Sequence, residues 1–150
     1  MRVVIQRVTG ASVKIEGKEH ASVGQGMLVL LGIEQEDTEE DVIWLTRKIS
    51  QLRIFNDAQG VMNLSVNETR GDILVVSQFT LHAKTKKGNR PSYVRAAPPE
   101  TAIPLYEDFL KKLQKQIDGN VRSGVFGARM EVSLVNDGPV TILIDTKRKE

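Results

Sequence analysis

The sequence predicts an α+β domain: a curved, barrel-like, mostly antiparallel β-sheet with two main helices packed on it. Two observations lead to this fold class. Most of the chain consists of short runs with the alternating or continuous apolar pattern of strands, and only two stretches carry apolar residues at helical spacing. The 150 residues contain no repeat, linker or low-complexity stretch, so residues 1–150 are expected to form one domain around one core.

The strands are predicted from two patterns. Alternating apolar and polar residues, typical of half-buried strands, open the chain over residues 1–8 and 11–16. Continuous apolar runs, typical of strands buried on both faces, occupy residues 26–33 and 72–79. Shorter strands complete the set: one ending near Gly24, two flanking a turn at residues 57–60, and the runs 121–126, 128–135 and 140–145.

Both helices are predicted from their starts and their apolar spacing. The first opens with Thr38 as the cap and an acidic first turn, and its core face consists of Val42, Leu45, Ile49 and Leu52. The second follows Pro98 and Pro99, runs to about Ile117, and is ended by Gly119.

Composition limits the function classes. The absence of cysteine excludes disulfides, thiol nucleophiles and thiolate metal sites, and it indicates a reducing cytoplasm. The two histidines, His20 and His82, match no metal-ligand spacing. No apolar run is long enough to span a bilayer or to form the core of a signal peptide. We therefore expect a cytoplasmic protein that needs no cofactor or metal and has no membrane partner.

The run Asn136-Asp137-Gly138-Pro139-Val140-Thr141 interrupts two strand-like runs. Proline fixes φ and removes an N–H, glycine adopts backbone geometry that other residues avoid, and only an X–Pro bond is readily cis. Gly138-Pro139 could therefore present two carbonyl oxygens as a rigid recognition surface without side chains. Such a surface suits an enzyme that reads the chirality of a substrate backbone. Taken alone, the run is more typical of a simple Asn-Asp-Gly-Pro hairpin turn than of such a surface.

A second polar segment, Ser77-Gln78-Phe79-Thr80-Leu81, ends the buried strand at residues 72–79. Its hydroxyls, amide and free backbone N–H groups could bind a carbonyl and its developing oxyanion, or could simply satisfy the strand end. No base adjoins them, and there is no Gly-x-Ser-x-Gly elbow, so a Ser-His-Asp hydrolase is poorly supported. His82 with a distant acid stays open as an alternative.

The charge distribution adds a third feature. No acidic residue occurs between Ile73 and Pro99, whereas five cations do: Lys84, Lys86, Lys87, Arg90 and Arg95. A compact basic loop is an electrostatic footprint for phosphate groups, although lysines also keep ordinary loops soluble.

These segments together resemble the D-aminoacyl-tRNA deacylases. The resemblance is carried by residues 77–81 and 136–141, by Lys87-Gly88-Asn89-Arg90-Pro91-Ser92, and by the opening Met-Arg-Val-Val-Ile-Gln-Arg-Val with Ala11-Ser12-Val13. It covers the whole chain, and three motifs in the same order are far more specific than any one of them.

The resemblance implies a homodimer that hydrolyses the ester between a D-amino acid and the 3′-terminal adenosine of tRNA, with no DNA partner. Gly138-Pro139 of one subunit would enter the pocket of the other, where its carbonyls fix the α-amino group and exclude the L-configuration. The expected catalytic residues are Ser77, Gln78 and Thr80. The expected substrate-binding residues are Phe79, Asn136, Gly138, Pro139, Val140 and Thr141. The five cations would grip the acceptor-stem phosphates.

The missing base fits this activity, because the ribose 2′-hydroxyl of tRNA can help to activate water and an activated ester needs less barrier lowering. We expect Thr80 to position the substrate, since nothing nearby in sequence activates its hydroxyl for attack. A site that reads only Cα substituents would accept many D-side chains, and it would also hydrolyse glycyl-tRNA.

Three other functions remain open from the sequence. One is an editing domain acting on an L-aminoacyl-tRNA, like that of archaeal threonyl-tRNA synthetases, although the free-standing chain and its Gly-Pro argue against it. The second is a non-catalytic RNA-binding module that uses the basic loop, with Tyr93 as a stacking residue. The third, a general small-ester hydrolase, lacks a visible nucleophile–base pair.

Overall fold

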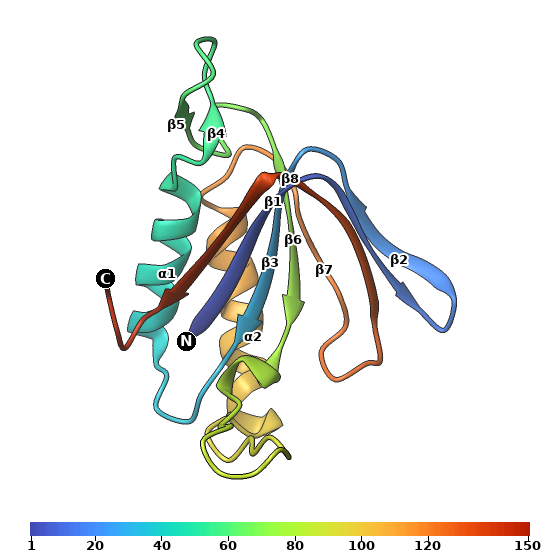
Figure 1. Cartoon of the computed structure of the whole chain (residues 1–150), viewed down its shortest axis with the longest axis vertical. Coiled ribbons are helices and arrows are strands. Elements are labelled where there is room, and N and C mark those ends of the chain that lie inside the picture. The colour runs from blue at the N-terminus through green and yellow to red at the C-terminus, as the bar shows by residue number, and fades with distance from the viewer.

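The computed structural model describes residues 1–150 and contains one large sheet (Figure 1). Its strands are β1 (Arg2–Ile15), β2 (Lys18–Val23), β3 (Gly26–Gly32), β6 (Asp72–Ser77), β7 (Val121–Ser123) and β8 (Glu131–Asp145). Their order is β2-β1-β3-β6-β7, and β8 pairs with β1. The three partners of β1 are antiparallel to it, whereas β6 is parallel to both β3 and β7. The predicted curved, mostly antiparallel sheet is confirmed.

The curvature comes from two long strands. β1 pairs with β3 through its first half and with β2 through its second half, while β8 follows β1 along nearly its whole length. Two register shifts between Gln6 and Gly10 mark the bend. In Figure 1, β1 and β8 arch over together, and their outer halves swing away with β2 to give the barrel-like outline.

Helices α1 (Glu39–Gln51) and α2 (Pro99–Gln114) share one core with the sheet. Val42, Leu45 and Ile49 from α1 meet Phe109 and Leu113 from α2 within a cluster of 20 buried residues. A second cluster, of seven buried residues, lies on the opposite face of β3 and β6. These two strands are therefore buried on both faces, as their continuous apolar runs predict. No helix of the structure is long and apolar enough to cross a membrane.

Several predicted boundaries are wrong. The first two predicted strands are one bent strand, β1 (Arg2–Ile15), and the last two are one strand, β8 (Glu131–Asp145), which continues through the Gly-Pro run. β6 ends at Ser77, because the chain turns there into the 3₁₀ helix η1 (Phe79–His82). β7 covers only three residues. The short strands β4 (Phe55–Asn56) and β5 (Met62–Leu64) do flank the predicted turn.

Gly119 does not end the second helix, which stops at Gln114. The Gln114 side chain instead turns back, accepting from the Val121 backbone N–H and donating to the Gly119 carbonyl. A Cβ on Gly119 would lie 2.2 Å from the carbonyl oxygen of Gly71. The glycine is therefore required for a close approach of two backbones rather than for capping.

Candidate active site

The polar end of β6 opens into a small cavity. Ser77, Gln78 and Phe79 line it, and its volume is about 110 Å³. The rest of the wall consists of Leu31, Ile33, Ala97, Ala102, Phe126 and Gly127. Ligand sites usually measure roughly 300–1,000 Å³, so this cavity alone is small for a ligand site.

Hydrogen-bond donors gather where η1 begins. Phe79 and Thr80 are its first two residues, and backbone N–H groups at that place have no partner within the turn. The Gln78 side-chain amide donates to Thr80 Oγ1. Because this oxygen accepts from an amide, the Thr80 hydroxyl hydrogen is free to be donated outward. The segment therefore offers an N–H pair and a hydroxyl, although Thr80 itself does not line the cavity.

His82 does not act as a base for these groups. Its side chain is fully buried, and neither ring nitrogen has a hydrogen-bond partner. The nearest acid is Glu34, whose Oε2 lies 3.9 Å from His82 Nδ1. The imidazole packs instead under Gly32, where an added Cβ would lie 3.0 Å from the ring. The Ser-His-Asp alternative therefore has no support from the geometry.

Phe126 lines the cavity and Tyr106 packs against it, and nothing in the sequence beyond their aromatic character indicates either position. The Tyr106 hydroxyl donates to the Val75 carbonyl over 3.3 Å, and its ring packs edge-on against Phe126 with centroids 5.6 Å apart. Burial raises the pKa of Tyr106 to about 12, so its hydroxyl remains a donor at every physiological pH. This pair ties the loop after β7 to β6.

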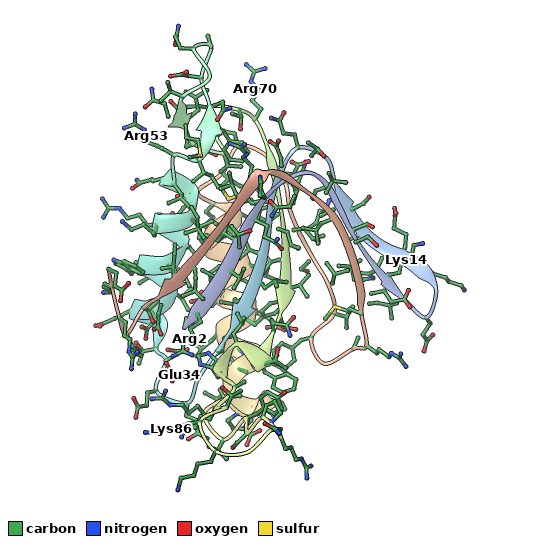
Figure 2. The ribbon with its side chains drawn as sticks, in the orientation of Figure 1. Arg2, Lys14, Glu34, Arg53, Arg70 and Lys86 are labelled. Atoms are coloured by element: carbon green, nitrogen blue, oxygen red, sulfur yellow. The ribbon has the colours of Figure 1, made fainter.

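An aromatic rim joins the cavity to the basic loop. The Phe79 ring is 56% exposed and meets Tyr93 edge to face, with centroids 5.0 Å apart. Beyond it, the loop is closed at its base by paired backbone hydrogen bonds between Lys84 and Ser92. All five predicted cations are exposed. The loop occupies one end of the molecule, where Figure 2 labels Lys86.

The Gly-Pro run forms a bulge in β8. Asn136 pairs with Val8 and Thr141 pairs with Gln6, so residues 137–140 all lie opposite Arg7 alone. The Gly138–Pro139 peptide bond is cis, Gly138 has φ of 119°, and both residues are exposed.

Asn136 and Thr141 close the base of this bulge. Asn136 Nδ2 donates to Thr141 Oγ1 over 3.0 Å, and the Val140 N–H donates to Asn136 Oδ1 over 3.3 Å. These two side chains therefore shape the bulge from within, and the exposed part consists of Gly138 and Pro139.

Arg7 lies within the opening motif, where the sequence indicated no role for it, and it contacts the Gly-Pro bulge. It continues the buried row of Val3 and Ile5 on β1, and only 6% of the residue is exposed. Its Nε donates to the Asp137 carbonyl over 3.2 Å and lies 3.1 Å from the Asp137 carboxylate. A Cβ on Gly138 would lie 2.9 Å from Nη2. A charged residue in an otherwise apolar inward row was the available signal.

The two signature segments of one chain are far apart. Ser77 aligns through Leu31 and Val3 with Ile144, whereas Asn136 aligns through Val8 and Gly26 with Asp72, at the other end of β6. Ser77 and Asn136 are thus separated by five residues along the strands, or about 16 Å. They are also separated by three strand spacings across the sheet, or about 14 Å. The Gly-Pro bulge therefore lies well away from the cavity of its own chain.

The structure places no group of three or more histidine, aspartate or glutamate side chains where they could hold a metal ion. The groups available at the cavity are thus hydroxyls, amides and backbone N–H donors. These can bind and polarise a carbonyl.

The chain thus combines a curved mixed sheet, a small cavity lined in part by Phe79 of η1, and a Gly-Pro bulge in its last long strand. The family model for D-Tyr-tRNA(Tyr) deacylase matches residues 4–145, and the chain belongs to this family. The resemblance seen in the motifs is confirmed.

Relatives match over full length. The chain is 63% identical to a D-aminoacyl-tRNA deacylase of Porphyromonas gingivalis and 59% identical to one of Flavobacterium johnsoniae, with 100% of both chains covered. The solved structure of a c-Myc DNA unwinding element binding protein matches with a TM-score of 0.93 at 43% identity, covering 97% of this chain and 99% of that one. A structure described as a probable eukaryotic D-amino acid tRNA deacylase gives 0.81 at 20% identity, covering 95% and 97%, which shows a shared fold.

Proposed function

We propose that the protein hydrolyses the ester bond of D-aminoacyl-tRNA and releases free D-amino acid and tRNA. The observation that carries this proposal is the separation of the two signature segments within a chain of the deacylase family. One segment lines a small cavity and carries unused donors, and the other is an exposed bulge of backbone carbonyls. The test is a comparison of the hydrolysis of D-tyrosyl-tRNA and L-tyrosyl-tRNA under identical conditions.

The working unit is a homodimer in which each chain supplies the bulge to its partner. A two-fold dimer uses the same patch on both subunits, so one contact would complete both sites. Two large apolar side chains of β8 on either side of the bulge are open to solvent: Val135 is 62% exposed and Leu143 is 68% exposed. A partner seated on this face of β8 would cover both side chains.

A larger cavity lies on the same face of β8 and supports the proposal that a partner subunit binds there. It measures about 530 Å³ and extends from Leu143 and Val4 to Leu81, the third residue of η1. It contains none of the predicted catalytic residues. A partner seated there would contact both β8 and η1, and so would reach the cavity at Ser77.

Catalysis would combine carbonyl polarisation with substrate assistance. The N–H groups of Phe79 and Thr80 stabilise the oxyanion that forms as water attacks the ester carbonyl carbon. The ribose 2′-hydroxyl relays the proton of the attacking water, and the C–O bond to the 3′-oxygen then breaks. The 3′-oxygen leaves with a proton, which gives a free carboxylate and intact tRNA. Thr80 positions the carbonyl rather than attacking it.

Chirality would be read by backbone alone. The carbonyls of Gly138 and Pro139 accept hydrogen bonds from the α-amino group, and an L-side chain would point into the bulge. No side chain of the bulge then selects among D-amino acids, so the site accepts many of them. Glycyl-tRNA, which has no side chain to exclude, would be hydrolysed as well.

Affinity for the acceptor end would come from the basic loop. The double variant Lys86→Ala/Lys87→Ala should raise KM for D-tyrosyl-tRNA about tenfold and leave kcat unchanged, because both charges lie outside the cavity. The slope of log KM against log salt should fall by about 1 to 2. The measurement is steady-state hydrolysis at several salt concentrations.

Lys14→Ala/Lys18→Ala is the matched control, because it removes the same charge at the β1–β2 turn, where Figure 2 labels Lys14. An equal rise of KM in both double variants would remove the loop from tRNA binding.

A non-catalytic nucleic-acid-binding role is the second candidate, and the basic loop with its Phe79–Tyr93 rim favours it. One structural neighbour is named for binding a DNA element. Charge alone does not separate RNA from DNA. Binding of either polymer without turnover of any aminoacyl-tRNA would favour this second role.

A further inference from the structure

Arg7 connects the Gly-Pro bulge to a part of the chain that no motif singled out. Its Nη1 donates to the Ile54 carbonyl over 2.7 Å and to Asn56 Oδ1 over 3.2 Å. Ile54 immediately precedes β4 and Asn56 ends it, so both acceptors come from the β4–β5 hairpin. One guanidinium thus joins three elements: β1, the hairpin and the bulge in β8.

We propose that the β4–β5 hairpin positions Gly138-Pro139 through Arg7, and that Asn56 is a positioning residue for the deacylation site. The inference rests on the proposed function, since it assigns the hairpin a part in the same reaction. A guanidinium is planar and its five donors form a fixed fork. Holding Nη1 on the hairpin therefore fixes the directions of Nε and Nη2, and with them the contacts to Asp137 and Gly138.

The contact between Arg7 and the bulge is tight enough that a movement of the guanidinium would move the bulge. Nη2 would lie 2.9 Å from a Cβ on Gly138, so the guanidinium occupies the space directly beside that backbone. Nε is engaged by both the carbonyl and the carboxylate of Asp137. A change in the tilt of Arg7 must therefore move residues 137 and 138 or break these contacts.

The hairpin itself is a firm support. Phe55 is 2% exposed and anchors it in the main core. The Asp57 carboxylate accepts from the Val61 and Gln59 backbone N–H groups at 3.0 and 2.9 Å, and the Val61 bond is the main reason that the pKa of Asp57 is lowered. Arg53 Nε donates to the Asn63 carbonyl over 2.7 Å. Figure 2 labels Arg53 at this end of the molecule.

The expected consequence is a loss of rate and discrimination rather than of affinity. Gly138-Pro139 acts in the partner's site, where a displacement of a fraction of an ångström alters how the α-amino group is held. The tRNA contacts at the basic loop do not change. Disturbing the hairpin should therefore lower kcat and the preference for D-tyrosyl- over L-tyrosyl-tRNA while KM stays the same.

The experiment compares Asn56→Leu with Asn56→Asp and Asn63→Ala. Asn56→Leu removes the acceptor at similar size, whereas Asn56→Asp keeps an acceptor for Arg7. Asn63 lies in the same hairpin, and its amide contacts Asp57 instead of Arg7. We expect kcat for D-tyrosyl-tRNA to fall about tenfold in Asn56→Leu only, with unchanged KM and an unchanged melting temperature. Wild-type kcat in Asn56→Leu, or equal losses in Asn56→Leu and Asn63→Ala, would overturn the proposal.

A second readout separates this proposal from the proposed function. Amide resonances of Asp137 and Gly138 should shift in Asn56→Leu and stay in place in Asn63→Ala. If the wild type does not hydrolyse D-tyrosyl-tRNA, the proposed function fails, and the resonances still decide whether the hairpin controls the bulge. Unmoved resonances in Asn56→Leu would refute the coupling whatever the activity.

Discussion

Replacing Gly138 by alanine should lower D-tyrosyl-tRNA hydrolysis at least about 100-fold. Gly138 has φ of 119°, and an added Cβ would lie 2.9 Å from both Arg7 Nη2 and Val140 Cγ2. The bulge must therefore change shape, and its carbonyls leave the positions that bind the α-amino group. Pro139→Ala should act in the same direction, because it frees φ and adds an N–H to this surface. The measurement is single-turnover hydrolysis under conditions that keep the dimer intact.

Gly17→Ala is the control for backbone strain alone. Gly17 also has positive φ, of 75°, and a Cβ there would meet nothing within 4 Å. This variant should keep the wild-type rate, although it also places a side chain at a positive φ that favours glycine. Similar losses of activity in both glycine variants would mean that the effect of Gly138→Ala is a loss of folding.

Mixing two inactive variants tests whether the bulge acts in the active site of its own subunit or in that of the partner subunit. A Gly138→Ala subunit keeps an intact cavity, and a Thr80→Ala subunit keeps an intact bulge. Random exchange should make half of the dimers mixed, each with one complete site, and so recover about one quarter of the wild-type rate. No recovery after proven exchange would place the bulge in its own subunit's site.

Thr80→Ala should lower kcat about 100-fold and leave KM for tRNA nearly unchanged. The hydroxyl accepts from the Gln78 amide, and the alanine variant loses the outward donor that this bond directs. The backbone N–H groups of Phe79 and Thr80 remain, so activity above background should persist. Thr80→Ser keeps the hydroxyl and should retain most of the rate.

The same residue offers a test of mechanism. No base contacts Thr80 Oγ1, since the buried His82 ring has no hydrogen-bond partner. We therefore expect no D-aminoacyl adduct on Thr80 when the reaction is quenched and the mass of the intact protein is measured by mass spectrometry. An adduct that forms and decays at the rate of turnover would establish covalent catalysis instead.

The sequence was sufficient for the elements whose patterns are local. Continuous apolar runs located β3 and β6, and helical spacing located α1 and α2, because burial on both faces or on one stripe leaves a periodic trace. The turn from β6 into η1 at Phe79 is not marked by any such periodic pattern in the sequence. Phe79 continues the apolar run of β6 in sequence, yet its ring is 56% exposed at the rim of the cavity.

The motifs predict which segments form the site, but they do not show which contacts those segments make. Residues 77–80 and 136–141 were identified in the sequence, but their separation within one chain depends on the register of β1, β3, β6 and β8. Arg7 and Asn56 lie 49 positions apart, and the hydrogen bond between them exists only because the sheet brings the hairpin beside β1. Non-local pairing of this kind has no signal in a single sequence.

The most direct test of the account is the hydrolysis of D-tyrosyl-tRNA and L-tyrosyl-tRNA by the wild-type protein under identical conditions, with glycyl-tRNA as a third substrate. A site that reads only Cα substituents through backbone carbonyls should deacylate the D-ester rapidly and the glycyl ester measurably, and it should leave the L-ester intact. Equal hydrolysis of the D- and L-esters, or hydrolysis of neither, would contradict it.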